Sequence, residues 1–197
     1  MSLIHVFDLG NVLVFVHEEW FLDKLRASCR PGAPVEQVFR EHYERERVDR
    51  GGEFDSLHPL LVRDLGLTMS REELRLAWQY TFILNPPMLE VVGELPRPRF
   101  MLSNTNAPHV ERIEERWPEV FGLFDQCVFS HEVGMRKPEL GIFRHVESLS
   151  GEPAERHVFT DDLLKHIAGA RAAGWQAFQF RGVKDCRRRL AALGGEE

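Results

Sequence analysis

Short runs of apolar residues recur along the chain, and each is followed by polar or acidic residues. Five such runs occupy residues 3–7, 99–102, 126–129, 157–159 and 176–180. They lack the alternation of apolar and polar positions that marks a strand with one face in solvent. We therefore expect five strands buried on both faces, as in a parallel sheet.

Between these runs the apolar residues follow helical spacing. The segments that show it contain Val110, Ile113 and Trp117; Ile142, Phe143, Val146 and Leu149; and Leu164, Ile167 and Ala168. Strands that alternate with helices predict an α/β fold with a doubly wound parallel sheet. Such a sheet binds its ligands at the carboxyl ends of its strands.

The alternation breaks between residues 16 and 87. Apolar residues there have helical spacing, at Val35, Val38, Phe39 and Tyr43, at Leu57, Leu60, Leu61 and Leu65, and at Leu74, Ala77 and Trp78. No strand pattern is found in this stretch. We expect an all-helical insertion over 16–87 in a core formed by 1–15 and 88–197. Residues 14–17 and Asn85-Pro86-Pro87 would be the two hinges.

Composition limits the class of protein. With 197 residues, 43% of them hydrophobic, the chain can bury one core and a small second domain. The formal net charge of −6 argues against binding nucleic acid or a membrane surface, because phosphate-rich partners select basic proteins. Nothing in the composition indicates an oligomeric state.

The cysteines and the N-terminal residues bear on the cellular compartment. Cys29, Cys127 and Cys186 are widely spaced and form no CxxC pair, which argues against a disulfide framework or a zinc site. No basic segment precedes the first apolar run, and Asp8 interrupts that run long before it could span a bilayer. We expect a soluble, cytoplasmic protein.

Four motifs with chemical potential follow predicted strands in order along the chain. They read Phe7-Asp8-Leu9-Gly10-Asn11-Val12, Leu102-Ser103-Asn104-Thr105-Asn106, Gly134-Met135-Arg136-Lys137-Pro138-Glu139 and Val158-Phe159-Thr160-Asp161-Asp162. Together they offer an acid, a hydroxyl with backbone amides, a lysine and a pair of acids. These groups suffice to handle a phosphate and Mg²⁺.

Each motif suggests a role. The carboxylate of Asp8 can attack phosphorus, or a carbon bearing a leaving group, and form a covalent intermediate. Ser103 and Asn104 can bind phosphoryl oxygens where a helix begins. Lys137 stands among few lysines in a chain where arginine is the usual cation, and a compact ammonium suits a contact with phosphate and with the nucleophile.

Asp161 and Asp162 would join Asp8 at the same edge of the sheet. Three carboxylates at one place repel one another, and a hard divalent cation such as Mg²⁺ removes that conflict. The sequence alone does not say which of the two adjacent acids would bind the cation directly.

The ordered motifs resemble the haloacid dehalogenase superfamily, most of whose members are Mg²⁺-dependent phosphatases. The similarity covers essentially the whole chain, and the branch that reads FDLGNVL, LSNTN, GMRKP and DD includes bacterial sugar-phosphate phosphatases of the glucose-1-phosphate type. The resemblance implies that Asp8 forms an aspartyl-phosphate, that Lys137 is the motif lysine, and that the backbone carbonyl of Gly10 is a further metal ligand. It also implies a helical cap, with residues 49–53 similar to the cap specificity loop.

Two positions depart from the family pattern. Many family phosphatases have a general acid two residues after the nucleophile, where this chain has Gly10, and an asparagine four residues after the second acid, where it has His166. A histidine at this position could tune the metal site, but a place on the helix surface is the simpler expectation for His166. His17, Glu18 and Glu53 are candidates to replace the missing acid, although a polar surface role is the simpler expectation for each.

The sequence thus predicts a phosphatase that uses Mg²⁺ and acts on a small phosphorylated metabolite, favouring sugar 1-phosphates because their leaving oxygen is comparatively acidic. A 2-haloacid dehalogenase is the first alternative, because the same nucleophile can attack carbon. The second is a non-catalytic protein that binds a phosphorylated metabolite.

Overall fold

A five-stranded parallel sheet forms the centre of the molecule. The computed structural model describes residues 3–194, and the sheet order is β5-β4-β1-β6-β7. The strands are β1 (Ile4–Phe7), β4 (Arg99–Ser103), β5 (Gln126–Phe129), β6 (His157–Asp161) and β7 (Gln176–Gln179). Val6 in the middle strand lies opposite Phe100 on one side and Phe159 on the other. The predicted parallel sheet is confirmed.

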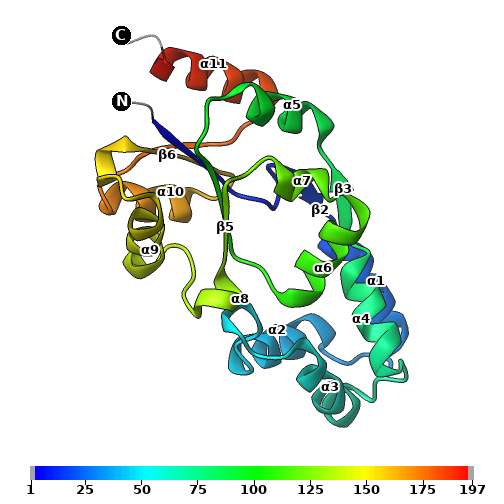
Figure 1. Ribbon diagram of the computed structural model, residues 1–197. Coiled ribbons are helices and arrows are strands. Elements are labelled where there is room, and N and C mark those ends of the chain that lie inside the picture. The colour runs from blue at the N-terminus through cyan, green and yellow to red at the C-terminus, as the bar shows by residue number, and fades with distance from the viewer. Residues whose placement is uncertain (1–2, 195–197) are drawn as a thin grey trace.

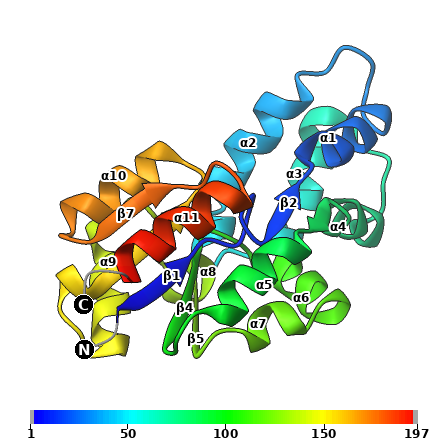
Figure 2. The ribbon, with the colours of Figure 1, turned by 90° about the horizontal axis from the view of Figure 1, so that it is seen from above.

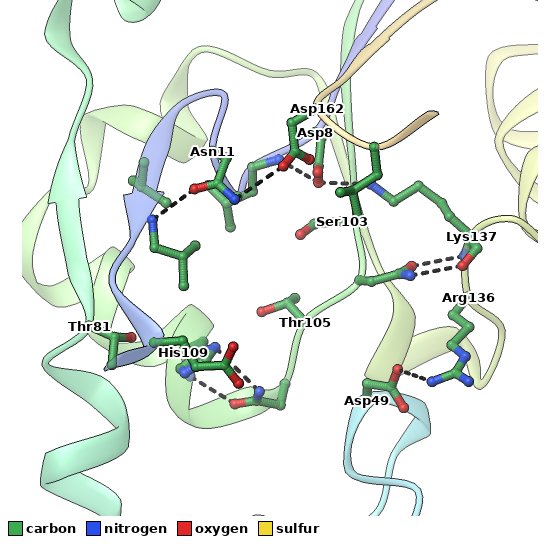
Figure 3. A pocket seen from close by; sticks show the side chains of 18 of the residues that line it. Asp8, Asn11, Asp49, Thr81, Ser103, Thr105, His109, Arg136, Lys137 and Asp162 are labelled. Carbon is green, nitrogen blue, oxygen red and sulfur yellow. Dashed lines mark hydrogen bonds and ion pairs between the residues drawn. The ribbon is translucent and has the colours of Figure 1, made fainter. Parts of the chain in front are cut away.

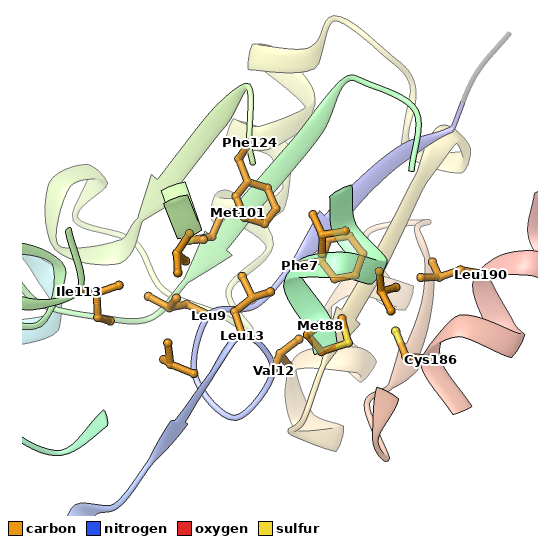
Figure 4. Close-up of a cluster of buried hydrophobic side chains, with 14 of the residues drawn as sticks. Phe7, Leu9, Val12, Leu13, Met88, Met101, Ile113, Phe124, Cys186 and Leu190 are labelled. Atoms are coloured by element: carbon orange, nitrogen blue, oxygen red, sulfur yellow. The ribbon is translucent and has the colours of Figure 1, made fainter. Parts of the chain in front are cut away.

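Helices cover both faces of this sheet (Figure 1). One face carries α5 (Pro86–Glu94), α6 (Ala107–Arg116), α7 (Glu119–Gly122) and α11 (Val183–Gly194); the other carries α9 (Leu140–Ser150) and α10 (Leu164–Ala172). Successive strand residues point to opposite faces. Accordingly, Phe7 packs with Met88 and Leu190 (Figure 4), whereas Val6 packs with Phe143 on the other side. This is the doubly wound arrangement that the sequence predicts.

The segment after β1 forms a cap with a hydrophobic core of its own. Its helices are α1 (Glu18–Ala27), α2 (Val35–Arg45), α3 (Leu57–Leu65) and α4 (Arg71–Gln79), with short turns η1 (Val48–Arg50) and η2 (Phe54–Ser56). Phe21, Phe39 and Trp78 meet at its centre, with the ring of Phe21 4.8 Å from each of the other two. Figure 2 shows α1, α3 and α4 grouped away from the sheet.

The connection between core and cap differs from the predicted one. Where the sequence predicts no strand, β3 (Phe82–Leu84) pairs with β2 (Val14–Val16) in an antiparallel ribbon, with Phe15 opposite Ile83. The expectation of an insertion without strands was therefore wrong. Three-residue strands leave almost no periodic signal, and these two lie far apart in the sequence, so nothing local marks the pairing.

A glycine turn of the cap reaches the core on the side away from the ribbon. Gly51 has φ +99°, and a Cβ added there would lie 3.0 Å from the carbonyl oxygen of His131, in α8 (Ser130–Val133). The neighbouring Arg50 donates two hydrogen bonds to the carboxylate of Glu139 in the core. The glycine thus permits the close approach that the sequence suggests for residues 49–53.

Two expectations about the whole chain can be compared with the structure. Cys29, Cys127 and Cys186 are free thiols. Among residues 3–194, no helix has both the length and the apolar character needed to cross a membrane.

Candidate active site

Asp8 lies at the carboxyl end of β1, where the sequence places the nucleophile. One of its oxygens is fixed: Oδ1 accepts a hydrogen bond of 2.7 Å from the amide of Leu9 and pairs with the ammonium of Lys137 at 2.8 Å. Among residues 3–194, no group donates a hydrogen bond to Oδ2. One carboxylate oxygen is therefore held in place while the other stays available for chemistry (Figure 3).

Lys137 joins three strands at this edge of the sheet. Its side chain is fully buried, and Nζ also contacts Asp161 Oδ2 at 2.7 Å and donates to the carbonyl oxygen of Leu102 at 2.8 Å. Burial would lower the pKa of Lys137, but the charges of Asp8 and Asp161 outweigh burial and raise it. The side chain is therefore an ammonium ion at neutral pH.

Asn104 holds the backbone of that lysine. Its amide nitrogen donates to the carbonyl oxygen of Lys137 at 2.9 Å, and its amide oxygen accepts from the Lys137 amide at 2.8 Å. Because both polar atoms of the Asn104 side chain already have partners, only its backbone amide could make the predicted contact with substrate. Ser103 ends β4 beside it and brings a buried hydroxyl to the cavity.

Asp161 is buried and has several hydrogen-bond donors around it. Its carboxylate contacts Lys137, accepts from the amide of Leu163 at 2.8 Å, and accepts from Nδ1 of His166 at 2.9 Å. Burial opposes its ionisation, yet Lys137 and His166 outweigh burial and hold the pKa of Asp161 below its usual value. His166 is 4% exposed, so the expected helix-surface role was wrong. The buried carboxylate needs this partner.

Asp162 has different surroundings. It lines the cavity, and its Oδ2 accepts a hydrogen bond of 3.1 Å from Asn11. Asn11 has φ +54° and also accepts from the amide of Val16 at 3.1 Å, so it ties Asp162 to the first residues of the cap. Burial raises the pKa of Asp162, and the charge of Asp161 adds to this effect.

The carboxylates outnumber the cations at this place. Burial raises the pKa of Asp8 to about 7; Lys137 opposes this shift, while Asp161 and Asp162 add to it. Asp8 is thus only about half ionised at pH 7, and a further positive charge nearby would increase its ionisation. The excess of negative charge favours a bound cation, and oxygen donors are what Mg²⁺ prefers.

Two sets of donors are available to such a cation. Asp8, Asp161 and His166 each have one ligand atom within 4.8 Å of the others, but Lys137 already occupies the space between the two carboxylates. The second set consists of Asp8 Oδ2, the Gly10 carbonyl and Asp162, which belong to three residues that line the cavity. The second set suits Mg²⁺ better, because every donor is an oxygen and no ammonium competes for it.

These groups lie at one end of a cavity of about 620 Å³ between core and cap. Cavities of this size are typical of small-molecule sites. Gly10 leaves room near Asp8, since a Cβ added there would have its closest contact with Val16, at 3.5 Å.

The candidates for a replacement acid do not converge on Asp8. Glu18 lines the cavity but pairs with Arg40 at 3.0 Å, while His17 stacks on Trp20 and is not among the lining residues. Glu53 is exposed outside the cavity. None of the three has a contact with the reacting carboxylate among the described residues.

Two residues that line the cavity, Asn11 and His109, were not identified from the sequence. Asn11 could have been found, because asparagine tolerates the left-handed conformation that a turn after glycine often needs. His109 gave no signal. It lines the cavity from α6, its ring stacks on Trp78 with centroids 4.4 Å apart, and the two residues are distant in the sequence.

Comparisons with known proteins place these features in a family. The sequence profile of the haloacid dehalogenase-like hydrolases matches residues 5–174. A drimenol cyclase from Aspergillus calidoustus is 29% identical over 197 residues, which cover 96% of this chain and 36% of that protein. A sesquiterpene phosphatase from Aspergillus oryzae is 29% identical over 174 residues, covering 86% and 85%. The chain thus spans only about a third of the cyclase.

Solved structures agree in fold. A HAD-like family hydrolase from Porphyromonas gingivalis aligns over 100% of both chains with a TM-score of 0.84 and 22% identity. A HAD family enzyme from Bacteroides thetaiotaomicron, in complex with magnesium and inorganic phosphate, covers 91% of this chain and 94% of its own, with a TM-score of 0.74 and 20% identity. With four motifs at one edge of the sheet and a family profile over most of its length, the chain belongs to the haloacid dehalogenase-like hydrolases and is a hydrolase enzyme.

Proposed function

We propose that this hydrolase is a Mg²⁺-dependent phosphatase of small phosphate monoesters. The observation that carries the proposal is the state of Asp8, whose Oδ1 is fixed by Lys137 and Leu9 while Oδ2 is free in the cavity. Oδ2 attacks phosphorus, the bond from phosphorus to the ester oxygen breaks, and an aspartyl-phosphate remains. Water then attacks that phosphorus, which releases phosphate and restores the carboxylate.

Each neighbour has a part in this reaction. The Ser103 hydroxyl binds a phosphoryl oxygen, Lys137 holds Asp8 and supplies positive charge beside the phosphate, and Asp161 positions Lys137. Asp8, Gly10 and Asp162 would hold Mg²⁺, which supplies positive charge against the phosphate when bound. The phosphatase name of one relative and the magnesium and phosphate of one structural neighbour support this assignment.

The test is release of inorganic phosphate from a panel of esters, with Mg²⁺ and with excess EDTA. We expect turnover with Mg²⁺ that EDTA abolishes and that Asp8→Asn lowers to below about 1% of wild type, because an amide is not a carboxylate nucleophile. Release of halide from 2-haloacids without Mg²⁺ would establish the dehalogenase alternative. Micromolar binding of phosphate esters without hydrolysis would favour a sensor.

Gly10 predicts a dependence on the leaving group. A positioned general acid is typically worth about 10²–10⁴ in rate, and none of the described side chains contacts Asp8 as such an acid. The rate should therefore rise with the acidity of the leaving alcohol, which favours aryl phosphates and sugar 1-phosphates over sugar 6-phosphates. Gly10→Asp should flatten this dependence; a flat dependence in the wild type would show that another acid acts.

Two substrate classes are thus candidates for the organic part of the ester. The resemblance of the motifs favours a sugar phosphate. The relative named as a sesquiterpene phosphatase adds an apolar phosphate ester. These classes make opposite demands on the wall of the cavity, because a sugar needs hydrogen-bond partners and a hydrocarbon needs apolar surface.

A further inference from the structure

The cavity has two parts of opposite character. The carboxylates and Lys137 occupy one end. Across the cavity from Asp8 and Asp162 lie Thr81 and His109 (Figure 3). Apolar and aromatic side chains dominate the remainder of the wall; they are Val14, Val16, Phe39, Tyr43, Trp78, Phe82, His109 and Ile113. We call these eight residues the aromatic wall.

The polar atoms of the aromatic wall bond to one another or to neighbouring protein atoms. Trp78 Nε1 donates to Asn106 Oδ1 at 3.2 Å, and Asn106 Nδ2 donates to the Tyr43 hydroxyl at 3.0 Å. The Thr81 hydroxyl donates to the carbonyl oxygen of Trp78 at 3.2 Å. The donors of Trp78 and Thr81 are therefore used within the protein, whereas the Tyr43 hydroxyl accepts from Asn106 and keeps its own proton for a ligand.

His109 is a neutral aromatic surface at this place. Its Nε2 donates to the Trp78 carbonyl at 3.2 Å, which leaves Nδ1 as an acceptor for Asn106 Nδ2 at 3.3 Å. Burial lowers the pKa of His109 to about 3, so the ring carries no charge at neutral pH. With both nitrogens engaged, His109 offers a ligand its face and not a hydrogen bond.

Most charged side chains that line the cavity are paired with each other; the exposed Lys165 has no ion pair among the described residues. Arg40 pairs with Glu18 at 3.0 Å, and Arg136 donates to Glu44 and Asp49 at 2.9 Å each. Oδ1 of Asp49 has no hydrogen-bond partner, but it is itself buried and so presents no surface to a ligand. These charges therefore add little free hydrogen-bonding capacity for a sugar.

We infer that the substrate is the phosphate ester of an apolar alcohol, whose hydrocarbon group packs on the aromatic wall. The inference rests on the proposed function, since it names the substrate of the same site. Hydrolysis consumes water and yields the free alcohol and inorganic phosphate. A sugar in the same place would bury several hydroxyl groups against a wall that offers few free hydrogen-bond partners, which is unfavourable. A hydrocarbon would lose only its contact with water, which is favourable.

A series of straight-chain alkyl phosphates tests the inference. Their leaving alcohols have nearly the same acidity, so differences in kcat/KM report contact with the wall. We expect kcat/KM to rise from ethyl to octyl phosphate by up to about fourfold for each buried methylene. Glucose 6-phosphate, whose leaving oxygen is also that of a primary alcohol, should fall at least about 100-fold below octyl phosphate. Equal or faster hydrolysis of glucose 6-phosphate, or no rise with chain length, would overturn the inference.

Variants of one strand provide a matched pair. Phe82→Ala removes part of the aromatic wall and should weaken the dependence on chain length, whereas Ile83→Ala, which alters a side chain that is 43% exposed and outside the cavity lining, should leave it unchanged. Equal effects of the two substitutions would contradict a role for the wall.

Binding can be separated from chemistry with alkylphosphonates, which have no leaving oxygen. Their Kd for the wild-type protein with Mg²⁺, measured by calorimetry, should fall with chain length in parallel with the rise in kcat/KM. Affinity independent of chain length would count against the inference. If alkyl phosphates and sugar phosphates are hydrolysed equally well, the proposed phosphatase stands and only the inference fails. If no ester in the panel releases phosphate, the proposed function fails, and the inference with it.

Discussion

The raised pKa of Asp8 predicts that ionisation of this carboxyl group destabilises the folded protein. Its pKa is about 7, against 3.8 for an ordinary aspartate. The native state therefore keeps the proton of Asp8 to a higher pH than the unfolded state does. Because the native state binds more protons over this range, the free energy of unfolding falls as pH rises from about 4 to about 7, and it stays reduced above that.

The size of the effect follows from the shift. About three pK units at about 1.4 kcal/mol each give an upper limit near 4 kcal/mol. Asp8→Asn removes this cost, keeps an oxygen to accept from Leu9, and gives up the ion pair with Lys137. We therefore expect Asp8→Asn to be more stable than wild type by about 1–3 kcal/mol above pH 7, which for a chain of this length raises Tm by about 3–9 °C.

The assay is thermal unfolding in EDTA at a series of pH values from 5 to 8. The advantage of Asp8→Asn should be largest at pH 8 and shrink toward pH 5, where Asp8 of the wild type is protonated. Asp23→Asn is the control, because that side chain is 73% exposed and its substitution should change stability by less than about 0.5 kcal/mol. A lower Tm for Asp8→Asn than for wild type at pH 8, or an advantage independent of pH, would refute the reasoning.

Two further predictions concern the neighbours of Asp8. Mg²⁺ should raise the Tm of the wild type by mass action; Asp162→Asn should remove most of this gain, whereas Asp161→Asn should lower stability even in EDTA, by about 3–5 kcal/mol, because it breaks the buried pair with Lys137. Equal behaviour of the two variants in both conditions would contradict their separate roles. A Cβ at Gly169 would lie 2.6 Å from the Cβ and 2.8 Å from the carbonyl oxygen of Pro138, next to Lys137. Gly169→Ala should therefore cost about 1–3 kcal/mol and lower kcat, while Gly122→Ala, with open space around it, should do neither.

The sheet could be predicted from the sequence because its strands are buried on both faces. Continuous apolar runs located all five of them to within a residue or two at each end. The ends were less certain for a physical reason. Strands β4 and β6 continue through Ser103 and through Thr160 and Asp161, whose backbones stay in the hydrogen-bonded ladder although their side chains are polar.

The face of helix α10 was predicted less well. Apolar spacing placed Leu164 on the buried side, but it is 63% exposed, and His166 is buried with Ile167 and Ala170. The His166 side chain points inward because the buried carboxylate of Asp161 is out of reach of solvent and accepts a hydrogen bond from it. The spacing of apolar residues does not predict a polar side chain that is buried because it forms a hydrogen bond with another buried polar side chain.

The sequence also could not predict the separate roles that we propose for Asp161 and Asp162. Adjacent residues at the end of a strand point in opposite directions. Which of them faces Lys137 depends on the side of the sheet to which α9 and α10 pack. The aromatic wall was hidden for a similar reason, since Trp78 and His109 come from different helices and meet only when cap and core are assembled.

The ribbon that joins core and cap has a consequence for how such proteins can be altered. Val16 and Phe82 face each other across it, so the 65 residues between them, 17 to 81, form in topological terms one very long hairpin loop. A two-residue Asn-Gly turn could close the same two strands without disturbing their register. Asp8, the proposed nucleophile, precedes residues 17 to 81 in the sequence. Lys137, Asp161 and Asp162 follow them. Phe39, Tyr43 and Trp78 lie inside the exchangeable segment, so three of the eight residues of the aromatic wall can be replaced without altering Asp8, Lys137, Asp161 or Asp162.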